Sequence, residues 1–391
     1  MLVTGDSADR SVLATLFNGV PLTRPELATR TGLSRPTISE AVRRLVETGL
    51  IVPAGVRRGG LGRIPTYYRL ASTAGYVVAV DIGGDNLRIA VADLGGTIQH
   101  EDRQPTKATG ARRVAAQAAR MVQDATATVA DAFGPLRRVG ISAPGVIHAD
   151  GRIMSIAHQL GEDGPFDLLT PLEAGLSAPV VLDNNVNLAA LGERWRGHAR
   201  DVVTFAFLAV GAGIGMGLVH NGEVVRGAHG AAGEVAYLPL PGVLPRRERV
   251  GHGRELLAAE AGGYGMLAAL DARKSWPGKR PTTVAELFDQ AAAGVPAAVE
   301  LVEAEGRHLG LTVASACVVF DPELVVLGGG IGSNPQLLPA VREAVSTLVP
   351  FPPRVETSAL GDVASLTGAL YIALEGARAD LLRTVTAAET G

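Results

Sequence analysis

Residues 181–193 read V-L-D-N-N-V-N-L-A-A-L-G-E, and this stretch decides the fold class and raises the question of function. The apolar residues from Ala178 to Leu182 predict a buried strand, and a helical pattern follows the polar residues after it. A carboxylate and two asparagines stand between the two elements. Ligands of α/β folds bind at the carboxyl ends of the strands, so these polar residues are candidates for ligand contact. They form either a catalytic site or one that binds without reacting.

The composition indicates a globular chain with one basic end. The 391 residues are 47% hydrophobic, which is typical of two to three folded domains. The formal net charge is −3 overall, but residues 1–70 hold ten Arg and five acidic residues, a net +5, which leaves −8 for the remainder. A basic end on an acidic body predicts one domain that binds a polyanion.

Several classes of protein are excluded by simple counts. The single cysteine, Cys317, permits no intramolecular disulfide and no cysteine-based zinc site. Residues 1–10 lack the basic start and apolar stretch of a signal peptide. We find no run of about 18 apolar residues, so no membrane span is expected. The protein is expected to be soluble and cytoplasmic, without a membrane partner.

The first seventy residues predict three helices with clear end signals. Residues 11–18 have apolar side chains at helical spacing. A second helix starts after Thr23, a good N-cap, and ends at Gly32, while Ser34 caps a third helix that Gly49 closes. The third helix has a buried stripe of Ile38, Val42 and Leu45, and we expect its Ser, Thr and Arg side chains to face outward.

The residues after the third helix predict a β-hairpin whose tip, residues 57–63, carries arginines. Three helices and such a hairpin form a winged helix, which inserts its third helix into the major groove and places wing arginines on phosphates or in the minor groove. The alternative, a three-helix bundle with a solvated arginine face, does not account for the wing. The predicted DNA contacts are Ser34, Arg35, Pro36, Thr37, Ser39, Arg43, Arg44, Arg57, Arg58 and Arg63.

The rest of the chain shows the same plan twice. Residues 76–98 read as strand, glycine turn, strand, second turn and strand, and the pattern recurs at 202–225 with an Asn221-Gly222 hairpin turn. A duplicated unit of this kind predicts two related lobes that face a cleft. Glycine turns after strands can hold phosphates, because backbone N–H groups approach a ligand closely there. A third glycine cluster follows at 326–331.

These motifs resemble those of the ROK family (repressors, open reading frames and sugar kinases). The resemblance covers nearly the whole chain and rests on D81-I-G-G84, S142-A-P-G145, D183-N-N-V-N-L-A-A-L-G-E193, G211-A-G-I-G-M-G217, G227-A-H-G-A-A-G-E234 and D321-P-E-L-V-V-L-G-G-G330. It implies an α/β fold: an N-terminal winged helix-turn-helix, then a two-lobe actin-like, sugar-kinase fold of duplicated ribonuclease H-like units. The expected divisions are a DNA-binding domain at 1–72, a first lobe at 73–187 and a second lobe at 188–391, with the last helix packing back on the first lobe.

The resemblance also implies that the chain departs from the kinases at their catalytic positions. Asn184 matches the Asn of the kinase motif x-N-D-x-N, and Asn185 matches its Asp, the general base. An amide cannot accept the proton of a sugar hydroxyl. Asp85 and Ala212 stand where kinases have threonines in the two phosphate turns. We therefore expect no phosphoryl transfer, no catalytic residues and no ATP or Mg²⁺ cofactor.

The zinc motif of family kinases is absent as well. Tyr237 stands at the His position of G-E-x-x-H, and no cysteine follows it, so no metal is expected. Polar groups that match a sugar site remain, and Glu234 matches a family carboxylate that binds sugar hydroxyls. The predicted effector contacts are Gly145, His158, Gln159, Asn184, Asn185, Glu234, Tyr237 and Glu255, and the vestigial phosphate turns contain Asp81, Gly83, Gly84, Gly211, Gly213 and Gly215. Two alternatives remain open: these residues form a structural polar network, and Asn187 caps the following helix.

The resemblance implies a transcriptional regulator, usually a repressor in this family, that senses a sugar or sugar derivative without phosphorylating it. Its expected partners are a palindromic double-stranded DNA operator and a second copy of the chain, as a homodimer or homotetramer. Two other functions are kept: a bifunctional sugar kinase that also binds DNA, and a ROK-type regulator with no sugar ligand.

Overall fold

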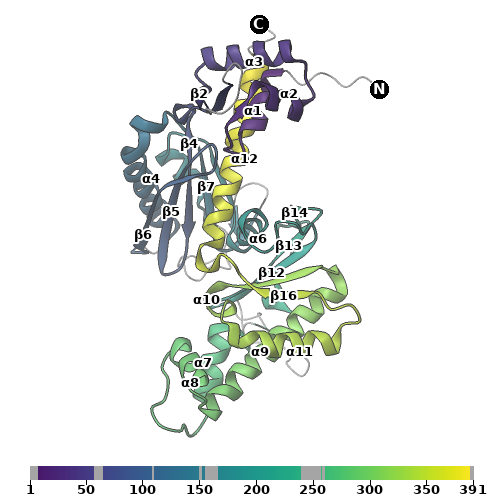
Figure 1. The fold of residues 1–391 in the computed structure, drawn as a ribbon. Coiled ribbons are helices and arrows are strands. Elements are labelled where there is room, and N and C mark those ends of the chain that lie inside the picture. The colour runs from purple at the N-terminus through teal and green to yellow at the C-terminus, as the bar shows by residue number, and fades with distance from the viewer. Residues whose placement is uncertain are drawn as a thin grey trace.

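The computed structural model describes residues 8–56, 65–107, 110–148, 152–154, 166–238, 257 and 260–387. Its first part is the predicted winged helix, seen at the top of Figure 1. A three-stranded sheet of order β1-β3-β2 packs beside three helices. The elements are α1 (Ala8–Leu16), β1 (Leu22–Thr23), α2 (Arg24–Thr31), α3 (Arg35–Glu47), β2 (Ile51–Val56) and β3 (Thr66–Leu70).

The helix ends of the winged helix follow local chemistry, which is why the sequence predicts them. Thr23 caps α2 through a capping box with Glu26, and Gly32 ends the helix at φ 71°, a conformation that glycine adopts without strain. Ser34 caps α3 by accepting the N–H of Thr37. The predicted stripe of Ile38, Val42 and Leu45 is buried against the rest of the domain.

Two five-stranded sheets with one topology form the two lobes, which confirms the duplicated fold. The sheets have the orders β11-β7-β4-β5-β6 and β14-β13-β12-β15-β16. In each, an antiparallel three-stranded meander is followed by two strands that pair in parallel. No helix of the described residues is long and apolar enough to cross a membrane.

The first lobe contains β4 (Tyr76–Ile82), β5 (Asn86–Asp93), β6 (Ile98–Pro105), α4 (Ala111–Phe133), β7 (Leu136–Ala143), α5 (Leu169–Gly175) and β11 (Val180–Asn184), with a small sheet of β8 (Val146–Ile147), β9 (Arg152–Met154) and β10 (Phe166–Asp167). The second contains β12 (Phe205–Val210), β13 (Ile214–His220), β14 (Glu223–Val224), α7 (Gly262–Ala272), α8 (Val284–Ala292), α9 (Pro296–Phe320), β15 (Leu324–Gly328), α10 (Gly329–Gly332), α11 (Leu338–Leu348) and β16 (Arg354–Thr357). Short 3-10 helices are η1 (Ser72–Ala74), η3 (Val235–Tyr237), η4 (Pro335–Leu337) and η5 (Gly361–Val363).

The strand predicted at 178–182 differs from the one observed. β11 begins at Val180 and runs to Asn184, and only Asp183 within it is buried. The prediction of a buried strand is wrong because β11 is an edge strand, paired with β7 on one side only. The shift places Asp183 and Asn184 in the last two positions of the strand.

Two helices, α6 (Asn185–Arg196) and α12 (Ala364–Ala387), cross between the lobes and pack against each other. Their backbones touch at glycines. A Cβ atom on Gly368 would lie 1.8 Å from the Leu188 carbonyl oxygen, and one on Gly192 would lie 2.3 Å from that of Ala364. We call this contact the α6–α12 crossing; it accepts no side chain at either position.

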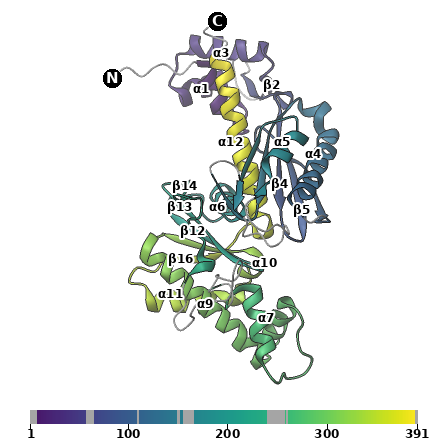
Figure 2. The same ribbon diagram turned by 180° about the vertical axis from the view of Figure 1, so that it is seen from behind.

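Beyond the crossing, α12 continues into the winged helix, as Figures 1 and 2 show from opposite sides. The buried residues of α12 from Leu366 to Leu381 belong to one apolar cluster with residues of α1, of α3 and of the five-stranded sheet of the first lobe. Arg378 fastens this junction, because its guanidinium donates to the carbonyl oxygens of Phe17 at 2.9 Å and Leu94 at 2.8 Å. The winged helix therefore shares a core with the first lobe.

Gly368→Ala is expected to lower the free energy of unfolding by about 1–3 kcal/mol, the usual cost of forcing atoms into a packed contact. The same exchange in an open helix would be stabilising by up to about 1 kcal/mol, because alanine has the higher helix propensity. Urea unfolding followed by circular dichroism measures the difference. Gly376→Ala on the same helix is the matched control, because the three atoms nearest to the new methyl all belong to the Arg138 side chain, which can move. Equal effects of the two exchanges would contradict the α6–α12 crossing as described.

Candidate functional site

The N-terminal half of α3 presents an open polar face. Ser34, Arg35, Pro36, Thr37 and Ser39 are all exposed. The Ser34 hydroxyl lies 2.7 Å from that of Thr37, so these two hydroxyls are linked at the helix start. The structure therefore places five of the predicted DNA contacts together on one accessible surface.

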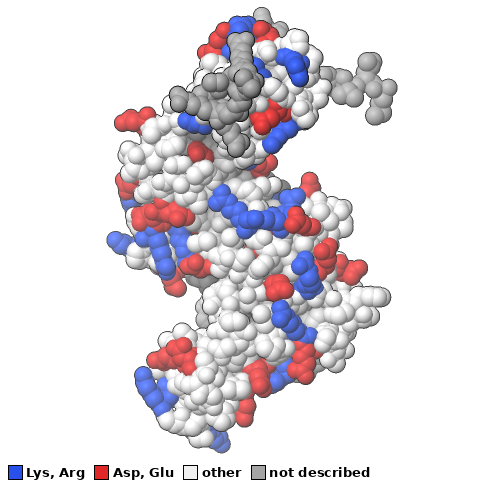
Figure 3. Space-filling view, in the orientation of Figure 1, with Lys and Arg blue, Asp and Glu red and all other residues white. Residues whose placement is uncertain are grey.

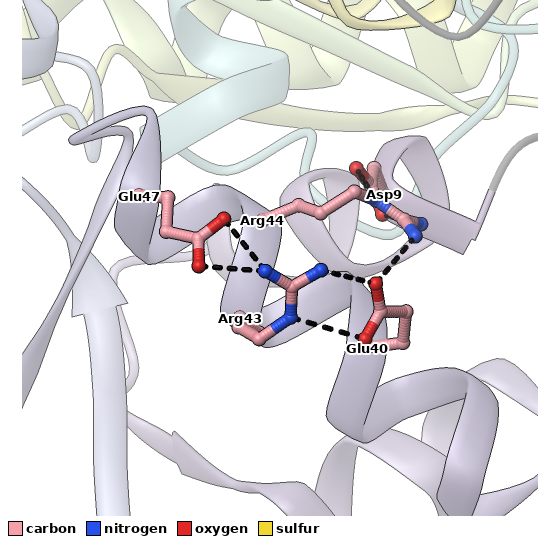
Figure 4. Close-up of polar contacts among 5 residues, drawn as sticks. All are labelled: Asp9, Glu40, Arg43, Arg44 and Glu47. Atoms are coloured by element: carbon pink, nitrogen blue, oxygen red, sulfur yellow. Dashed lines mark hydrogen bonds and ion pairs between the residues drawn. The ribbon is translucent and has the colours of Figure 1, made fainter.

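Arg43 and Arg44, at the other end of α3, are held by acidic neighbours (Figure 4). Arg43 bridges Glu40 at 2.5 Å and Glu47 at 2.7 Å on its own helix. Hydrogen bonds to Glu40 and then Glu47 raise the pKa of the Arg43 guanidinium, and the bond to Arg43 lowers the pKa of Glu40. Arg43 stays on the surface, but its charge is already matched by two carboxylates.

Arg44 has a structural partner that the sequence did not reveal. Its guanidinium donates to both oxygens of Asp9 in α1, at 2.9 and 2.6 Å, and Asp9 is only 4% exposed. Arg44 is less open than Thr37 and Ser39, because its side chain is 37% exposed and paired with the buried Asp9, and it stays a predicted DNA contact. Figure 3 shows that basic and acidic side chains are interspersed over the visible part of the winged helix.

The wing is described only up to its tip. β2 and β3 pair antiparallel with a register shift between Pro53 and Val56, which confirms the predicted hairpin. Arg57, Arg58 and Arg63 lie outside the described residues.

A second candidate site is the cleft between the lobes. It contains a cavity of about 400 Å³, within the range of small-molecule sites. The carboxyl ends of β4 and β11 meet it from the first lobe, and the turn after β12 and the glycines after β15 meet it from the second. Its lining includes the predicted residues Asp81, Gly83, Gly145, Asn184, Asn185, Gly211, Gly213, Gly215 and Glu234.

The two asparagines of the opening stretch have different roles. Asn184 is the N-cap of α6: its Oδ1 accepts the N–H of Val186 at 2.8 Å and of Asn187 at 3.2 Å, and its Nδ2 donates to the Gly145 carbonyl oxygen. The suggestion that Asn187 caps this helix is therefore wrong; it lies inside the first turn and is buried. The Asn185 side chain has no hydrogen-bond partner among the described residues, and it lines the cavity.

The Asp183 carboxylate is buried and paired. Its side chain is 8% exposed and lies 2.5 Å from the Arg226 guanidinium. Its other oxygen accepts the N–H of Asn184 at 2.7 Å. The carboxylate next to the asparagines thus holds the strand end in place.

The first glycine turn carries a cluster of charges that the sequence analysis missed. Asp81 is buried and accepts a hydrogen bond from the Ser142 hydroxyl at 2.6 Å. Arg88 lies 3.5 Å from Asp81 and 2.6 Å from Asp362, and both Arg88 and Asp362 line the cavity. Burial raises the pKa of Asp81, against the opposing effects of Ser142 and Arg88. The Asp81–Arg88 pair was detectable, because the two residues face each other across a hairpin; Asp362, 274 residues from Arg88, gives no local signal.

The second glycine turn, which begins at Gly211, is connected through the start of α7 to a buried carboxylate on α9. The N–H of Gly263, at the start of α7, donates to the Gly211 carbonyl oxygen at 2.8 Å. Glu305 on α9 accepts the N–H of Gly262 at 2.8 Å. Burial raises the pKa of Glu305 to about 7. Gly329 and Gly330, from the third glycine cluster, complete this side of the cavity.

The remaining predicted residues of the effector site and of the phosphate turns are not all placed in the cavity. Gly84 is exposed and Tyr237 is 41% exposed, and neither is among the residues that line the cavity. His158, Gln159 and Glu255 lie outside the described residues. Within the described ranges, no three His, Cys, Asp or Glu side chains group as metal ligands.

Sequence comparison places this arrangement in a known family. The ROK family profile matches residues 77–376, and a winged helix-turn-helix DNA-binding profile matches residues 6–52. The chain belongs to the ROK family. The ROK domain therefore comprises both lobes, and the winged helix precedes it.

Individual relatives include both regulators and kinases. The chain is 24% identical over 340 residues to the xylose repressor of Bacillus subtilis (strain 168), covering 86% of each protein. The crystal structure of a ROK family transcriptional regulator, a homologue of the E. coli MLC protein, superposes with a TM-score of 0.77 at 21% identity, over 97% of this chain and 98% of that one. The ROK hexokinase from Thermus thermophilus is 32% identical with a TM-score of 0.62, over 76% of this chain and 97% of that one.

The buried carboxyl behind the second turn of the ROK domain makes stability depend on pH. Because the pKa of Glu305 rises from 4.5 to about 7 on folding, its contribution is fully present below pH 4.5 and is lost as pH rises toward 7. Glu305→Gln is expected to remove this dependence, a change of about 3 kcal/mol between pH 4.5 and 8 relative to the parent protein. Urea unfolding across that range measures it. Glu303→Gln, an exposed exchange on the same helix, is the control, and parallel pH profiles for the parent and Glu305→Gln would contradict the assignment.

Proposed function

We propose that this ROK protein is a sugar-responsive transcriptional repressor that senses its effector in the cleft without phosphorylating it. The observation that carries the proposal is Asn185, an amide at the cavity wall where ROK kinases place their general base. General-base catalysis of phosphoryl transfer needs a group that takes the proton from the sugar hydroxyl, and an amide does not. Asp183, the neighbouring carboxylate, is occupied by Arg226.

The cleft is well suited to binding. The Asn185 amide and the Glu234 carboxylate come from opposite lobes, so one ligand would touch both. Amide and carboxylate groups match the donors and acceptors of a polyol, and a buried polar group left without a partner costs about 1–3 kcal/mol. Sugars with misplaced hydroxyls would therefore bind less well.

The winged helix supports a role in transcription, and α12 supplies a route between the two sites. Ala364 and Ser365, at the start of α12, line the cavity, while its other end shares a core with α1. An effector that favours one position of α12 would favour one position of the winged helix, and the coupling equals the difference in ligand affinity between the two states. We further propose that a homodimer, or a homotetramer, reads a palindromic operator, which would match the symmetry of a paired winged helix.

Arg35→Ala is expected to weaken operator binding about tenfold or more, because an arginine that contacts a base edge contributes about 1–3 kcal/mol of discrimination. Arg43→Ala should have a smaller effect, since Glu40 and Glu47 already pair with Arg43. Fluorescence anisotropy would measure both, on an operator that the parent protein selects from random DNA. Arg307→Ala, on an exposed face of α9, is the control. If Arg35→Ala binds like the control, α3 is not the reading helix.

Calorimetric titration without ATP is expected to detect binding of one or more sugars from a panel of pentoses, hexoses and amino sugars. Glu234→Gln should weaken that binding about tenfold, the loss expected for a hydrogen bond to a charged group. Glu356→Gln, a carboxylate outside the cavity, is the control. The same sugar with ATP and Mg²⁺ should yield no sugar phosphate. Turnover above a no-protein blank would contradict the non-catalytic assignment, and absence of any sugar binding would contradict sensing.

A further inference from the structure

A second cavity lies outside the cleft, between β6 and α4 of the first lobe. It measures about 420 Å³, within the range of small-molecule sites. We call it the α4–β6 pocket, and its described lining is Gln104, Lys107, Arg113, Ala116, Gln117 and Arg120. None of these residues also lines the cleft cavity. Three of the six are basic and none of the six is acidic.

Basic side chains border the α4–β6 pocket from two elements. Arg113, Ala116 and Arg120 share one face of α4, because residues three and seven positions apart lie on the same side of a helix. Arg113 and Arg120 are two turns apart, roughly 10 Å along the helix axis, with the small side chain of Ala116 between them. Lys107 comes from the segment after β6. Arg113 also lies in the first turn of α4, where the helix dipole adds positive potential.

The three basic side chains are not neutralised by their described neighbours. Among the residues that the structure describes, the side chains of Lys107, Arg113 and Arg120 form no ion pair or hydrogen bond. Asp102 stands near the edge of the pocket, but its carboxylate accepts hydrogen bonds from the Gln104 amide at 3.1 Å and from the N–H of Arg103 at 2.7 Å. Like charges gathered in one hollow raise the local potential and attract an anion.

The backbone on the β6 side of the pocket is held in place. Gln117 is 7% exposed, and its amide donates to the Pro105 carbonyl oxygen at 2.8 Å and accepts the N–H of Lys107 at 3.2 Å. The Thr106 hydroxyl donates to the Gly83 carbonyl oxygen, in the first glycine turn, at 3.0 Å. The segment that carries Lys107 is therefore fastened to α4 and to that turn. A preformed wall has less conformational freedom to lose when a ligand binds.

We propose that the α4–β6 pocket binds a small molecule with two phosphate groups. A guanidinium donates two parallel hydrogen bonds to phosphate oxygens, so Arg113 and Arg120 supply two such contacts two helical turns apart. Lys107 adds a third positive charge from the facing segment. The inference is separate from sugar sensing, because the pocket and the cleft share no described lining residue.

The test is calorimetric titration of the full chain at low salt, without divalent metal, with three probes. Fructose 1,6-bisphosphate has its phosphates on opposite ends of a sugar, pyrophosphate has them adjacent, and inorganic phosphate has one. At least one of the first two is expected to bind about tenfold or more tightly than inorganic phosphate, because it makes an additional charge-assisted contact. Tighter binding of the bisphosphate indicates a phosphorylated sugar as the ligand, and tighter binding of pyrophosphate indicates a diphosphate group such as that of a nucleotide.

Arg113→Gln and Arg120→Gln are each expected to weaken the tighter probe about tenfold, the loss of one hydrogen bond to a charged group. Arg112→Gln is the matched control, since Arg112 is an exposed arginine on the same helix that does not line the pocket, and it should leave the affinity unchanged. All three exchanges are at exposed positions, and circular dichroism would verify that each variant is folded.

Three results would overturn the inference. One is that neither fructose 1,6-bisphosphate nor pyrophosphate binds more tightly than inorganic phosphate. Another is an equal loss of affinity in Arg112→Gln and Arg113→Gln, which would indicate general attraction to a basic surface. The third is a loss in Arg35→Gln with the two pocket variants unaffected, which would place the anion on α3. None of these results bears on whether the cleft binds a sugar.

Discussion

The backbone contact between α6 and α12 at Gly192 and Gly368 is the constraint on which the arrangement of this protein depends. Both helices pass between the lobes, and they can approach this closely only because neither position carries a side chain. Glu193, next to Gly192 and fully buried, secures the contact. Its carboxylate accepts hydrogen bonds from the Ser358 hydroxyl and from the N–H groups of Leu360 and His198. The chain therefore returns from the second lobe at one defined place.

The direction of α12 after this crossing links the cleft to the winged helix. α12 is a continuous helix of 24 residues that runs from the cavity to the winged helix. Its far end is fixed by Arg378 and by apolar packing with α1. The winged helix is packed against the first lobe through this shared core. The short segment around η1 is thus not the main connection between the two domains.

The two asparagines at the end of β11 differ in their structural roles. Asn184 caps α6 and holds the Gly145 loop. The Asn185 side chain has no hydrogen-bond partner among the described residues, and Asn185 is one of the positions, with Asp85 and Ala212, at which the sequence differs from the kinase motifs. Three arginines form ion pairs with nearby carboxylates: Arg88 in the cleft, and Arg43 and Arg44 in the winged helix. The ten arginines of residues 1–70 therefore overstate the positive charge that is free to meet DNA, whereas the net +5 already counts these carboxylates.

Local chemistry made much of the fold predictable from sequence. Caps such as Thr23 and Ser34, the glycine that ends α2, and the repeated strand-turn-strand pattern all act between residues close in the chain. Most residues of the cleft wall could also be predicted from the sequence, because glycine turns and polar residues at strand ends meet at one edge of each sheet. The edge position of β11 did not, since strand order is a property of the whole sheet.

What only the tertiary structure decided are the contacts between distant segments. Arg44 with Asp9, Arg88 with Asp362, and Glu193 with Ser358 join residues that are 35, 274 and 165 positions apart. No local pattern distinguishes such charged residues from others on the surface, because the partner is brought near only by packing of whole elements. The sequence by itself predicted a winged helix and a two-lobed cleft with an amide, Asn185, at the position that matches the kinase base. The tertiary structure decided which of its charges remain free, because pairing depends on distance in space.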